Sequence, residues 1–337
     1  MTARIAVFGA GLIGRRHVEQ ALSQAELVGI ADPSDMAQQV ASDAGATWFA
    51  DPEQCLAQTR PDGVVIATPN HLHAEHALQC IAASVPCLVE KPIADSAENA
   101  ARIVSAAEQS GVPVLIGHHR RHNPIVARAK EEIVSGRLGE IVAVSGQFWL
   151  YKPQDYFETT WRKGPGAGPT MINFIHDVDL LRHFCGNIVE VQAMRSNRQR
   201  GQSVEDTAAI LMRFETGVLG TFSLSDTVVA PWSWEMSAAE NPIYPHHPGS
   251  CYQIGGTHGG LSVPDLKLWT HDGPRSWWNP ISAQTLGVTP ADAFARQFSH
   301  FLDVINGATP RVSAAEGAKS LAAVLDVLQA GPPEIAS

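Results

Sequence analysis

The sequence predicts an α/β fold with two parts: an N-terminal domain on a parallel sheet, and a C-terminal α+β domain on a large, mainly antiparallel open sheet. The first observation is a charge-free run, Ile5–Phe8, which leads directly into a glycine-rich turn. The second is that short apolar runs then alternate with helical patterns up to about residue 118, as in repeated βα units. The third is the length of 337 residues, which favours two domains.

The glycine-rich turn has the spacing G-x-G-x-x-G and follows the first strand without a gap. In such a turn Gly9 permits the tight bend, Gly11 lets the backbone approach a pyrophosphate, and Gly14 lets the helix pack closely on the strand. Leu12 and Ile13, within the turn, are candidate cofactor contacts. The N-terminus of the helix expected at Arg15–Ser23 offers free N–H groups and a partial positive charge to phosphates. This arrangement is typical of a Rossmann dinucleotide-binding domain.

An acidic residue ends the second predicted strand, Leu27–Ala31. Asp32 lies eighteen residues after Gly14, where a carboxylate can accept hydrogen bonds from both hydroxyls of an adenosine ribose. It would repel a 2′-phosphate, and Pro33-Ser34 includes no arginine to hold one. NAD is therefore favoured over NADP.

The rest of the N-terminal domain, residues 1–118, continues the βα alternation. Right-handed crossovers between the strands make the sheet parallel, and ligands bind in crevices at the carboxyl ends of such strands. Two loops follow strand ends in this way, and we expect them to line the cofactor pocket; they contribute Thr68, Pro69, Asn70, His73, Glu90 and Lys91. The helices are expected at 35–44, 52–58, 74–83 and 96–110, and the strands at 47–49, 64–67, 87–89 and 112–116.

From residue 119 to 337 the pattern changes to long segments in which polar and apolar residues alternate, as in an antiparallel sheet with one covered face. The final helices can pack back on the first domain. The segment 230–249 is rich in Pro, Trp and His and reads as a long loop, forming either a substrate wall or a subunit contact. Strands are expected at 140–151, 189–195, 206–214, 218–225, 261–263 and 266–269, and helices at 124–135, 171–184, 292–306 and 313–330.

Composition excludes several classes of function. The net charge is −10 with no basic run, which argues against nucleic-acid binding. The five cysteines have no C-x-x-C pair, so neither a disulfide framework nor a zinc site is expected, and reduced thiols in a cytoplasm are the simple interpretation. No apolar run approaches the roughly 18 residues of a membrane span. The chain enters the glycine motif almost at once, so no signal peptide is expected.

Lys91 is the first candidate for chemistry. It follows a buried strand, beside the expected nicotinamide crevice, within Glu90-Lys91-Pro92. An ammonium there can hydrogen-bond a substrate hydroxyl or carbonyl, stabilise an alkoxide and relay a proton. On spacing alone, an ordinary exposed lysine at a strand end remains the alternative.

Three motifs in this order resemble those of the Gfo/Idh/MocA oxidoreductases: the glycine turn, Thr68-Pro69-Asn70-x-x-His73, and Glu90-Lys91-Pro92. The resemblance covers essentially the whole chain, including Gly117–Pro124, where His122 replaces the usual aromatic residue, and the Trp161-Arg162 segment. It implies an NAD-dependent dehydrogenase that needs no metal. It also implies a homodimer or homotetramer formed through the C-terminal sheet.

The segment from Ile172 to Asp179 is similar to the family's D-x-x-x-H-x-x-D helix, and His176 matches the catalytic histidine that takes the hydroxyl proton. Asp179, one turn on, either orients the imidazole or forms a structural ion pair. Ile172 stands where inositol-dehydrogenase-like members carry an acid, and Asn173 is the nearest polar neighbour, able to hydrogen-bond a substrate without acting as a base. Further candidate substrate contacts are Arg121, Trp161 and Arg162, although either arginine can instead hold the domain interface.

The sequence thus predicts an NAD-dependent oxidoreductase acting on a sugar, cyclic polyol or sugar acid, with Lys91 and His176 as catalytic residues. The missing acid at Ile172 leaves two alternatives on the same fold, because a fold does not determine a function. One is a non-catalytic sensor of NAD(P). The other is a redox-assisted glycosidase with tightly held NAD.

Overall fold

The computed structural model describes residues 2–164 and 166–330, without the side chains of Thr160 and Trp161. Contacts within the chain divide it into two compact units. Unit 1 runs to His122 and includes Ala293–Leu321. Unit 2 comprises Asn123–Asp292 and the described residues from Ala322 onward.

Unit 1 is built on a six-stranded parallel sheet with the order β3-β2-β1-β4-β5-β6. The predicted parallel sheet is therefore confirmed. The chain moves outward from β1 to β3 and then returns to the other side of β1, so the order reverses between β1 and β4, where ligands of open α/β sheets bind. The strands are β1 Arg4–Phe8, β2 Glu26–Ala31, β3 Thr47–Phe49, β4 Gly63–Ile66, β5 Cys87–Val89 and β6 Val114–Ile116.

Helices cover this sheet, and its strands contribute apolar side chains to the core. Ile5, Val7, Val65, Leu88 and Leu115 have no exposed surface. The helices are α1 Leu12–Gln24, α2 Asp35–Asp43, α3 Pro52–Thr59, α4 His73–Ala82 and α5 Ala97–Ser110, with 3-10 turns η1 Asn70–Leu72 and η2 His119–His122.

A helix from late in the sequence completes unit 1. Helix α9, Ala293–Ile305, contributes Phe298 and Phe301 to the core of the parallel sheet, and both side chains are fully buried. Helix α10, Ala314–Gln329, begins in unit 1 and ends in unit 2.

Unit 2 contains an eight-stranded sheet with the order β14-β13-β12-β11-β7-β10-β9-β8. It is antiparallel except where β7 and β10 pair in parallel, with Leu219 opposite Ala143. The predicted large, mainly antiparallel sheet is confirmed, although β11 and β14 were not predicted. The strands are β7 Ile141–Trp149, β8 Ile188–Ser196, β9 Thr207–Phe214, β10 Leu219–Ser225, β11 Tyr252–Gly256, β12 Gly259–Val263, β13 Lys267–His271 and β14 Ile281–Thr285.

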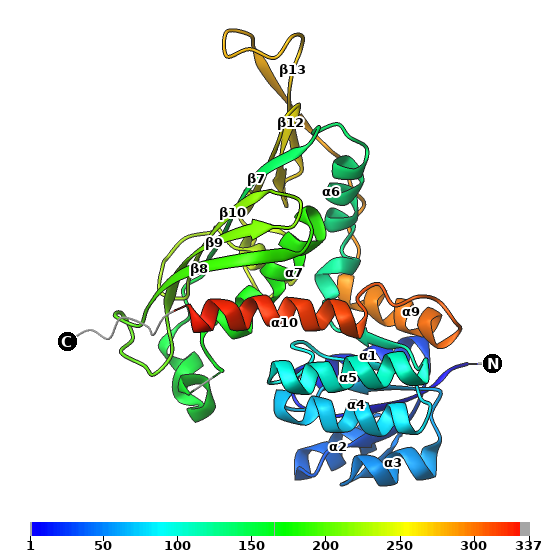
Figure 1. Ribbon diagram of the computed structural model, residues 1–337. Helices are drawn as coiled ribbons and strands as arrows, with labels where there is room; N and C mark the ends of the chain where they lie inside the picture. The colour runs from blue at the N-terminus through cyan, green and yellow to red at the C-terminus, as the bar shows by residue number, and fades with distance from the viewer. Residues whose placement is uncertain (1, 165, 331–337) are drawn as a thin grey trace. The chain divides into compact units, whose positions relative to one another are not determined.

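Two helices cover one face of this sheet, α6 Pro124–Val134 and α7 Ile175–Cys185 (Figure 1). Burial alternates along β9 because these helices cover only one face of the sheet. Every second residue from Ala208 to Phe214 is buried, and the residues between them face outward. The Trp/His-rich segment holds one short helix, α8 Trp234–Ser237.

The other face of the sheet, called the outer face here, exposes large apolar side chains. Strand pairing places five of them on this face, from β8, β9, β10, β13 and β14. They are Met194 (80% exposed), Leu211 (55%), Leu219 (53%), Trp269 (40%) and Ile281 (57%).

Candidate active site

The glycine turn fits the approach of a dinucleotide. Gly9 has a φ of +92°, and a Cβ there would lie 2.5 Å from a carbonyl oxygen of the chain just after β4. A Cβ on Gly14 would lie 2.0 Å from the Gly9 oxygen, whereas one on Gly11 would meet no atom within 4 Å. The turn is therefore packed on both sides and open at Gly11. Leu12 and Ile13 follow as exposed first residues of α1, whose first turn holds no acid.

Asp32 is fixed at the end of β2 by three hydrogen bonds. Ala10 N–H donates to its Oδ2 over 2.8 Å, and Ser34 donates to Oδ1 from its N–H (2.8 Å) and hydroxyl (2.6 Å). Burial raises the pKa of Asp32, but these hydrogen bonds outweigh burial and leave the pKa below its ordinary value. The side chain is consequently an ionised carboxylate beside the glycine turn.

Glu90 is a buried carboxylate immediately before Lys91. Its Oε1 lies 2.8 Å from Nε2 of His17 on α1, and its Oε2 accepts the backbone N–H of Lys91 over 3.2 Å. Burial raises the pKa of Glu90, but the hydrogen bond and charge of His17, together with the charge of Lys91, bring it down to about 2. An anion is thus held against the backbone of the partly exposed Lys91.

His73 joins the two loops that follow β4 and β5. Its Nε2 lies 2.8 Å from the Thr68 oxygen and its Nδ1 lies 2.8 Å from the Pro92 oxygen, with 1% of the residue exposed. Burial lowers the pKa of His73, while the hydrogen bonds to the Pro92 and Thr68 oxygens oppose that shift. Pro69 and Asn70, between these contacts in sequence, are exposed. Direct contact of His73 with the cofactor stays a prediction.

The candidate substrate contacts are divided between the units. Arg121, in η2 of unit 1, is 7% exposed, and its carbonyl oxygen accepts a hydrogen bond from Arg311. Arg162, Asn173 and His176 lie in unit 2. The side chain of Trp161 lies outside the described residues.

A π-helical turn, Thr170–Phe174, precedes α7 and carries Ile172 and Asn173. Such turns are rare and occur frequently at functional sites. The Thr170 N–H donates to Glu205 Oε1 over 3.0 Å, and a Cβ on Gly168 would lie 2.3 Å from the same oxygen. Glycine at 168 therefore lets the carboxylate reach the start of this turn.

His176 lies in the first turn of α7 and is 9% exposed. Its neighbour Asp177 accepts a hydrogen bond from the Tyr252 hydroxyl, and Asp179 is almost fully buried, with 1% exposed. These contacts anchor the start of the helix to the sheet beneath it.

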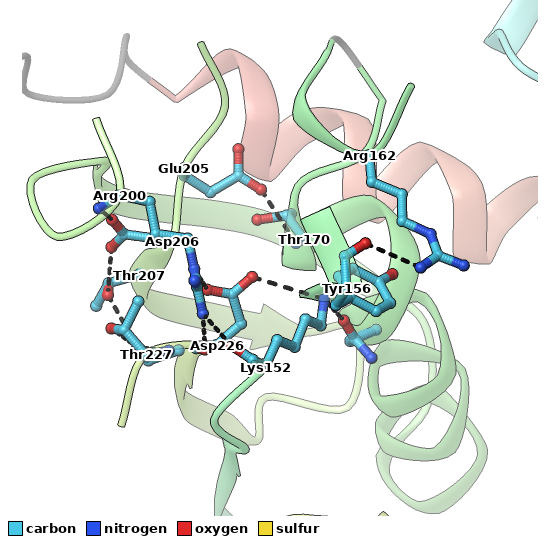
Figure 2. Close-up of polar contacts among 12 residues, drawn as sticks. Lys152, Tyr156, Arg162, Thr170, Arg200, Glu205, Asp206, Thr207, Asp226 and Thr227 are labelled. Carbon is cyan, nitrogen blue, oxygen red and sulfur yellow. Dashed lines mark hydrogen bonds and ion pairs between the residues drawn. The ribbon is translucent and has the colours of Figure 1, made fainter. Parts of the chain in front are cut away.

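Lys152 is a residue that the sequence analysis missed. Its Nζ donates to Asn173 Oδ1 over 2.8 Å, lies 3.6 Å from Asp226 Oδ2, and stands 5.1 Å from the centre of the Tyr156 ring (Figure 2). Burial lowers the pKa of Lys152, while the charges of Asp226 and Glu235 oppose that shift. The only feature of the sequence that could have pointed to Lys152 is its position as a single lysine directly after a long alternating strand.

Two arginines extend this cluster. Arg200 Nε donates to Asp226 Oδ1 over 2.7 Å, and Arg162 stacks on the Tyr156 ring with its guanidinium carbon 4.2 Å from the centroid (Figure 2). Burial raises the pKa of Asp226, and the charges of Lys152 and Arg200 counter it. The cluster is thus a network of compensated charges beside the π-turn.

Two general features of the described residues bear on function. Within 2–164 and 166–330, no three His, Cys, Asp or Glu side chains gather as metal ligands would. In the same part of the chain, no helix combines the length and apolar character needed to cross a bilayer.

Comparison with known proteins covers both units. Residues 3–118 match the model of an oxidoreductase family with an NAD-binding Rossmann fold, and residues 126–262 match the GFO/IDH/MocA C-terminal domain. An inositol 2-dehydrogenase of Rubrobacter xylanophilus is 30% identical over 272 residues, 78% of this chain and 72% of that relative. The 4-carboxy-2-hydroxymuconate-6-semialdehyde dehydrogenase of a Sphingobium species is 29% identical over 226 residues, 66% of this chain and 71% of that relative.

Among solved structures, the WlbA dehydrogenase of Bordetella pertussis, in complex with NADH and UDP-GlcNAcA, superposes with a TM-score of 0.80. It is 25% identical, and the match covers 98% of this chain and 96% of that one. The resemblance seen in the sequence motifs is therefore confirmed over both units, and the chain belongs to the Gfo/Idh/MocA family of NAD-binding oxidoreductases.

Proposed function

We propose that the protein transfers hydride between NAD and a secondary alcohol or carbonyl of a sugar, cyclic polyol or sugar acid. The observation that carries the proposal is the placement of Lys91 just after the carboxyl end of β5, with its backbone N–H bonded to the buried, ionised Glu90. An ammonium held there is suited to polarise a substrate oxygen. Dehydrogenases acting on such compounds, including an inositol 2-dehydrogenase, are among the relatives.

For the cofactor we propose NAD in preference to NADP. The open backbone at Gly11 and the N-terminus of α1 would hold the pyrophosphate, and the ionised Asp32 would accept the ribose hydroxyls. When bound, NAD supplies the group that accepts or donates hydride. A 2′-phosphate at the same place would face the Asp32 carboxylate.

The chain's own residues then handle the substrate oxygen and its proton. Lys91 donates a hydrogen bond to that oxygen and stabilises its negative charge. His176 accepts the hydroxyl proton during oxidation, or returns it during reduction. Arg121 and Arg162, with Trp161, are the proposed contacts to the remaining substrate groups.

The two parts of the chain have separate proposed tasks. Residues 1–118 bind the cofactor, and residues 119–337 bind the substrate and mediate oligomerisation, as a homodimer or homotetramer through the outer face. The proposed compartment is the cytoplasm, where the five cysteines, none of them in a C-x-x-C pair, would remain reduced.

The test is a screen of the purified protein with NAD, and separately with NADP, against polyols, aldoses and sugar acids. Absorbance of the reduced nicotinamide reports turnover. Turnover with NAD and one substrate class supports the proposal and names that class. Tight NAD binding without turnover of any compound, or cleavage of a glycoside without added NAD, would contradict it.

A further inference from the structure

We infer that Lys152 is a positioning residue that makes Asn173 a dedicated hydrogen-bond donor, so that the site selects a substrate with a carboxylate at that point. The inference rests on the proposed function and deepens it by naming a substrate class. It depends on the contacts of Lys152, on the orientation of the Asn173 carboxamide, and on the π-turn before His176.

Both the backbone and the side-chain ammonium of Lys152 are held by neighbouring groups. Its backbone N–H donates to the Asp226 oxygen over 2.9 Å, and its carbonyl oxygen accepts from Arg200 over 2.9 Å. Its ammonium is shared among Asn173, the Asp226 carboxylate and the Tyr156 ring, with only 8% of the side chain exposed (Figure 2). A lysine pinned in this way cannot turn outward to bind substrate, so it acts through its neighbours.

The charge of Lys152 settles which way the Asn173 carboxamide faces. An ammonium has three donors and no acceptor, so the atom 2.8 Å from its Nζ must be the amide oxygen. Both N–H bonds then point away from Lys152. Across residues 2–164 and 166–330, Asn173 Nδ2 donates to no protein group, and the residue is partly exposed. Two donors are thus available to a ligand.

The geometry of the π-turn determines which side chain of the preceding turn lies in line with His176. A π-turn closes its hydrogen bonds over five residues instead of four, so it rotates less per residue than an α-helix. Ile172, four residues earlier, therefore lies nearly in line with His176, and Asn173 is displaced to one side, toward Lys152. The side chain of the in-line residue is apolar and cannot form a hydrogen bond, so the polar side chain beside it on this turn is that of Asn173.

This arrangement specifies a hydrogen-bond acceptor in the substrate. A carboxylate side chain would accept the proton of a substrate hydroxyl, whereas the Asn173 amide can only donate on its free side. The acceptor that gains most from two N–H donors near a buried ammonium is an anionic oxygen pair. A sugar carboxylate meets that requirement, and its uncharged parent sugar does not.

The experiment compares matched ligands on the NADH-loaded protein by calorimetry. Glucuronate and galacturonate are titrated beside glucose and galactose, first with the wild-type protein and then with Asn173→Asp, Lys152→Met and Lys152→Arg. Lys130→Met is the matched control, because Lys130 donates to a carbonyl oxygen of α7 at His183, away from the π-turn. Binding of NADH to each variant shows that it is folded.

We expect the wild type to bind the acids at least about tenfold more tightly than the parent sugars, and Asn173→Asp to abolish this preference by charge repulsion. Lys152→Met should lose about tenfold in affinity for the acids and raise KM with little change in kcat. Lys152→Arg should restore most of the affinity for the acids. Lys130→Met should bind acids and parent sugars with the affinities of the wild type. Equal affinity for acid and parent, no binding of either, or an unchanged preference in Asn173→Asp overturns the inference. Turnover of uncharged sugars alone would overturn it and leave the proposed function standing.

Discussion

His17 Nε2 and Glu90 Oε1 lie 2.8 Å apart where solvent does not reach, with His17 fully buried and Glu90 6% exposed. The pair joins α1, the helix that follows the glycine turn, to the segment that carries Lys91. Glycine at 117 leaves space for this carboxylate, because a Cβ there would lie 2.9 Å from the carboxyl carbon of Glu90. The helix proposed to receive the pyrophosphate and the segment that carries Lys91, the residue proposed to polarise the substrate, are thereby fixed to each other within unit 1.

Replacing Glu90 by Gln should destabilise the protein in a pH-dependent way. The folded pKa of about 2 lies below the ordinary value of 4.5, so the charged group stabilises the fold above that ordinary value and loses its effect as pH falls toward 2. The full contribution near neutral pH is about 3 kcal/mol, of which about 1 kcal/mol is lost by pH 4.

Urea denaturation of both proteins at pH 7 and pH 4 measures this difference. The difference in free energy of unfolding between the wild type and Glu90→Gln should narrow on acidification, since the glutamine does not titrate. Glu316→Gln, at a partly exposed glutamate paired with Lys319, is the control and should cost little at either pH. A gap that is constant between pH 7 and pH 4 would show that Glu90 does not carry the charge described here.

Replacing either of two glycines in the same turn by alanine should affect different properties of the protein. Gly14→Ala places a Cβ 2.0 Å from a backbone oxygen and should cost at least about 3 kcal/mol of stability. Gly11→Ala meets no atom and should fold normally, yet weaken NADH binding by about tenfold. Thermal unfolding and NADH fluorescence titration separate the two effects. Normal NADH affinity in Gly11→Ala would show that the pyrophosphate does not approach there.

Lys91→Ala should retain NADH binding and lose turnover by about 10²- to 10⁴-fold, because the proposed role of the ammonium is to act on the substrate oxygen and not on the cofactor's phosphates. Steady-state kinetics on a substrate found by the screen, together with an NADH titration, measure both properties. Lys319→Ala, an exposed lysine paired with Glu316, is the control. Near-normal turnover of Lys91→Ala would disprove its catalytic role.

What the sequence predicted well is local or periodic. The glycine turn and the strand ends that precede Asp32 and Lys91 are recognisable because strand, turn and helix follow one another within a few residues, and backbone geometry demands glycine in the turn. The cofactor-binding and catalytic roles of Asp32 and Lys91 stay predictions. The parallel sheet followed from the alternation of apolar runs and helical patterns. Strand β14 was not predicted, because all five of its residues are exposed and no apolar alternation marks it.

What could not be predicted depends on contacts between distant segments. Lys152 reaches Asn173 across 21 positions of sequence, and its other partner Asp226 belongs to the end of a different strand. Likewise, Glu90 reads as an ordinary acid until α1 brings His17 against it from 73 positions away. The local sequence around each residue gives no sign of its distant partner, so only the folded structure identifies these pairs.

Asp32→Asn should narrow the preference for NADH over NADPH. The amide keeps the size of the side chain but removes the negative charge that repels a 2′-phosphate. Adding Ser34→Arg should raise NADPH affinity further by supplying a cation. Fluorescence titrations with both nucleotides test this, with the exposed neighbour variant Asp35→Asn as control. Equal affinity of the wild type for NADH and NADPH would contradict the role of Asp32.

The outer face of the unit 2 sheet should mediate self-association. Leu211 and Leu219 each expose more than half of their surface on neighbouring strands, and apolar side chains are repeated across the face as far as β14. Apolar patches of this kind mark association surfaces, because covering them removes apolar area from water. We therefore expect a dimer or tetramer in solution at micromolar concentration.

The double variant Leu211→Lys/Leu219→Lys should dissociate that oligomer, since desolvating two ammonium groups in an apolar interface is unfavourable. Both side chains point to solvent in the isolated unit, so NADH binding and thermal stability of the protomer should stay close to wild type. Leu22→Lys, at a 52% exposed leucine of α1, is the matched control and should leave the assembly intact. Light scattering coupled to size exclusion measures the mass. A monomeric wild type, or a double variant of unchanged mass, would show that this face is not the interface.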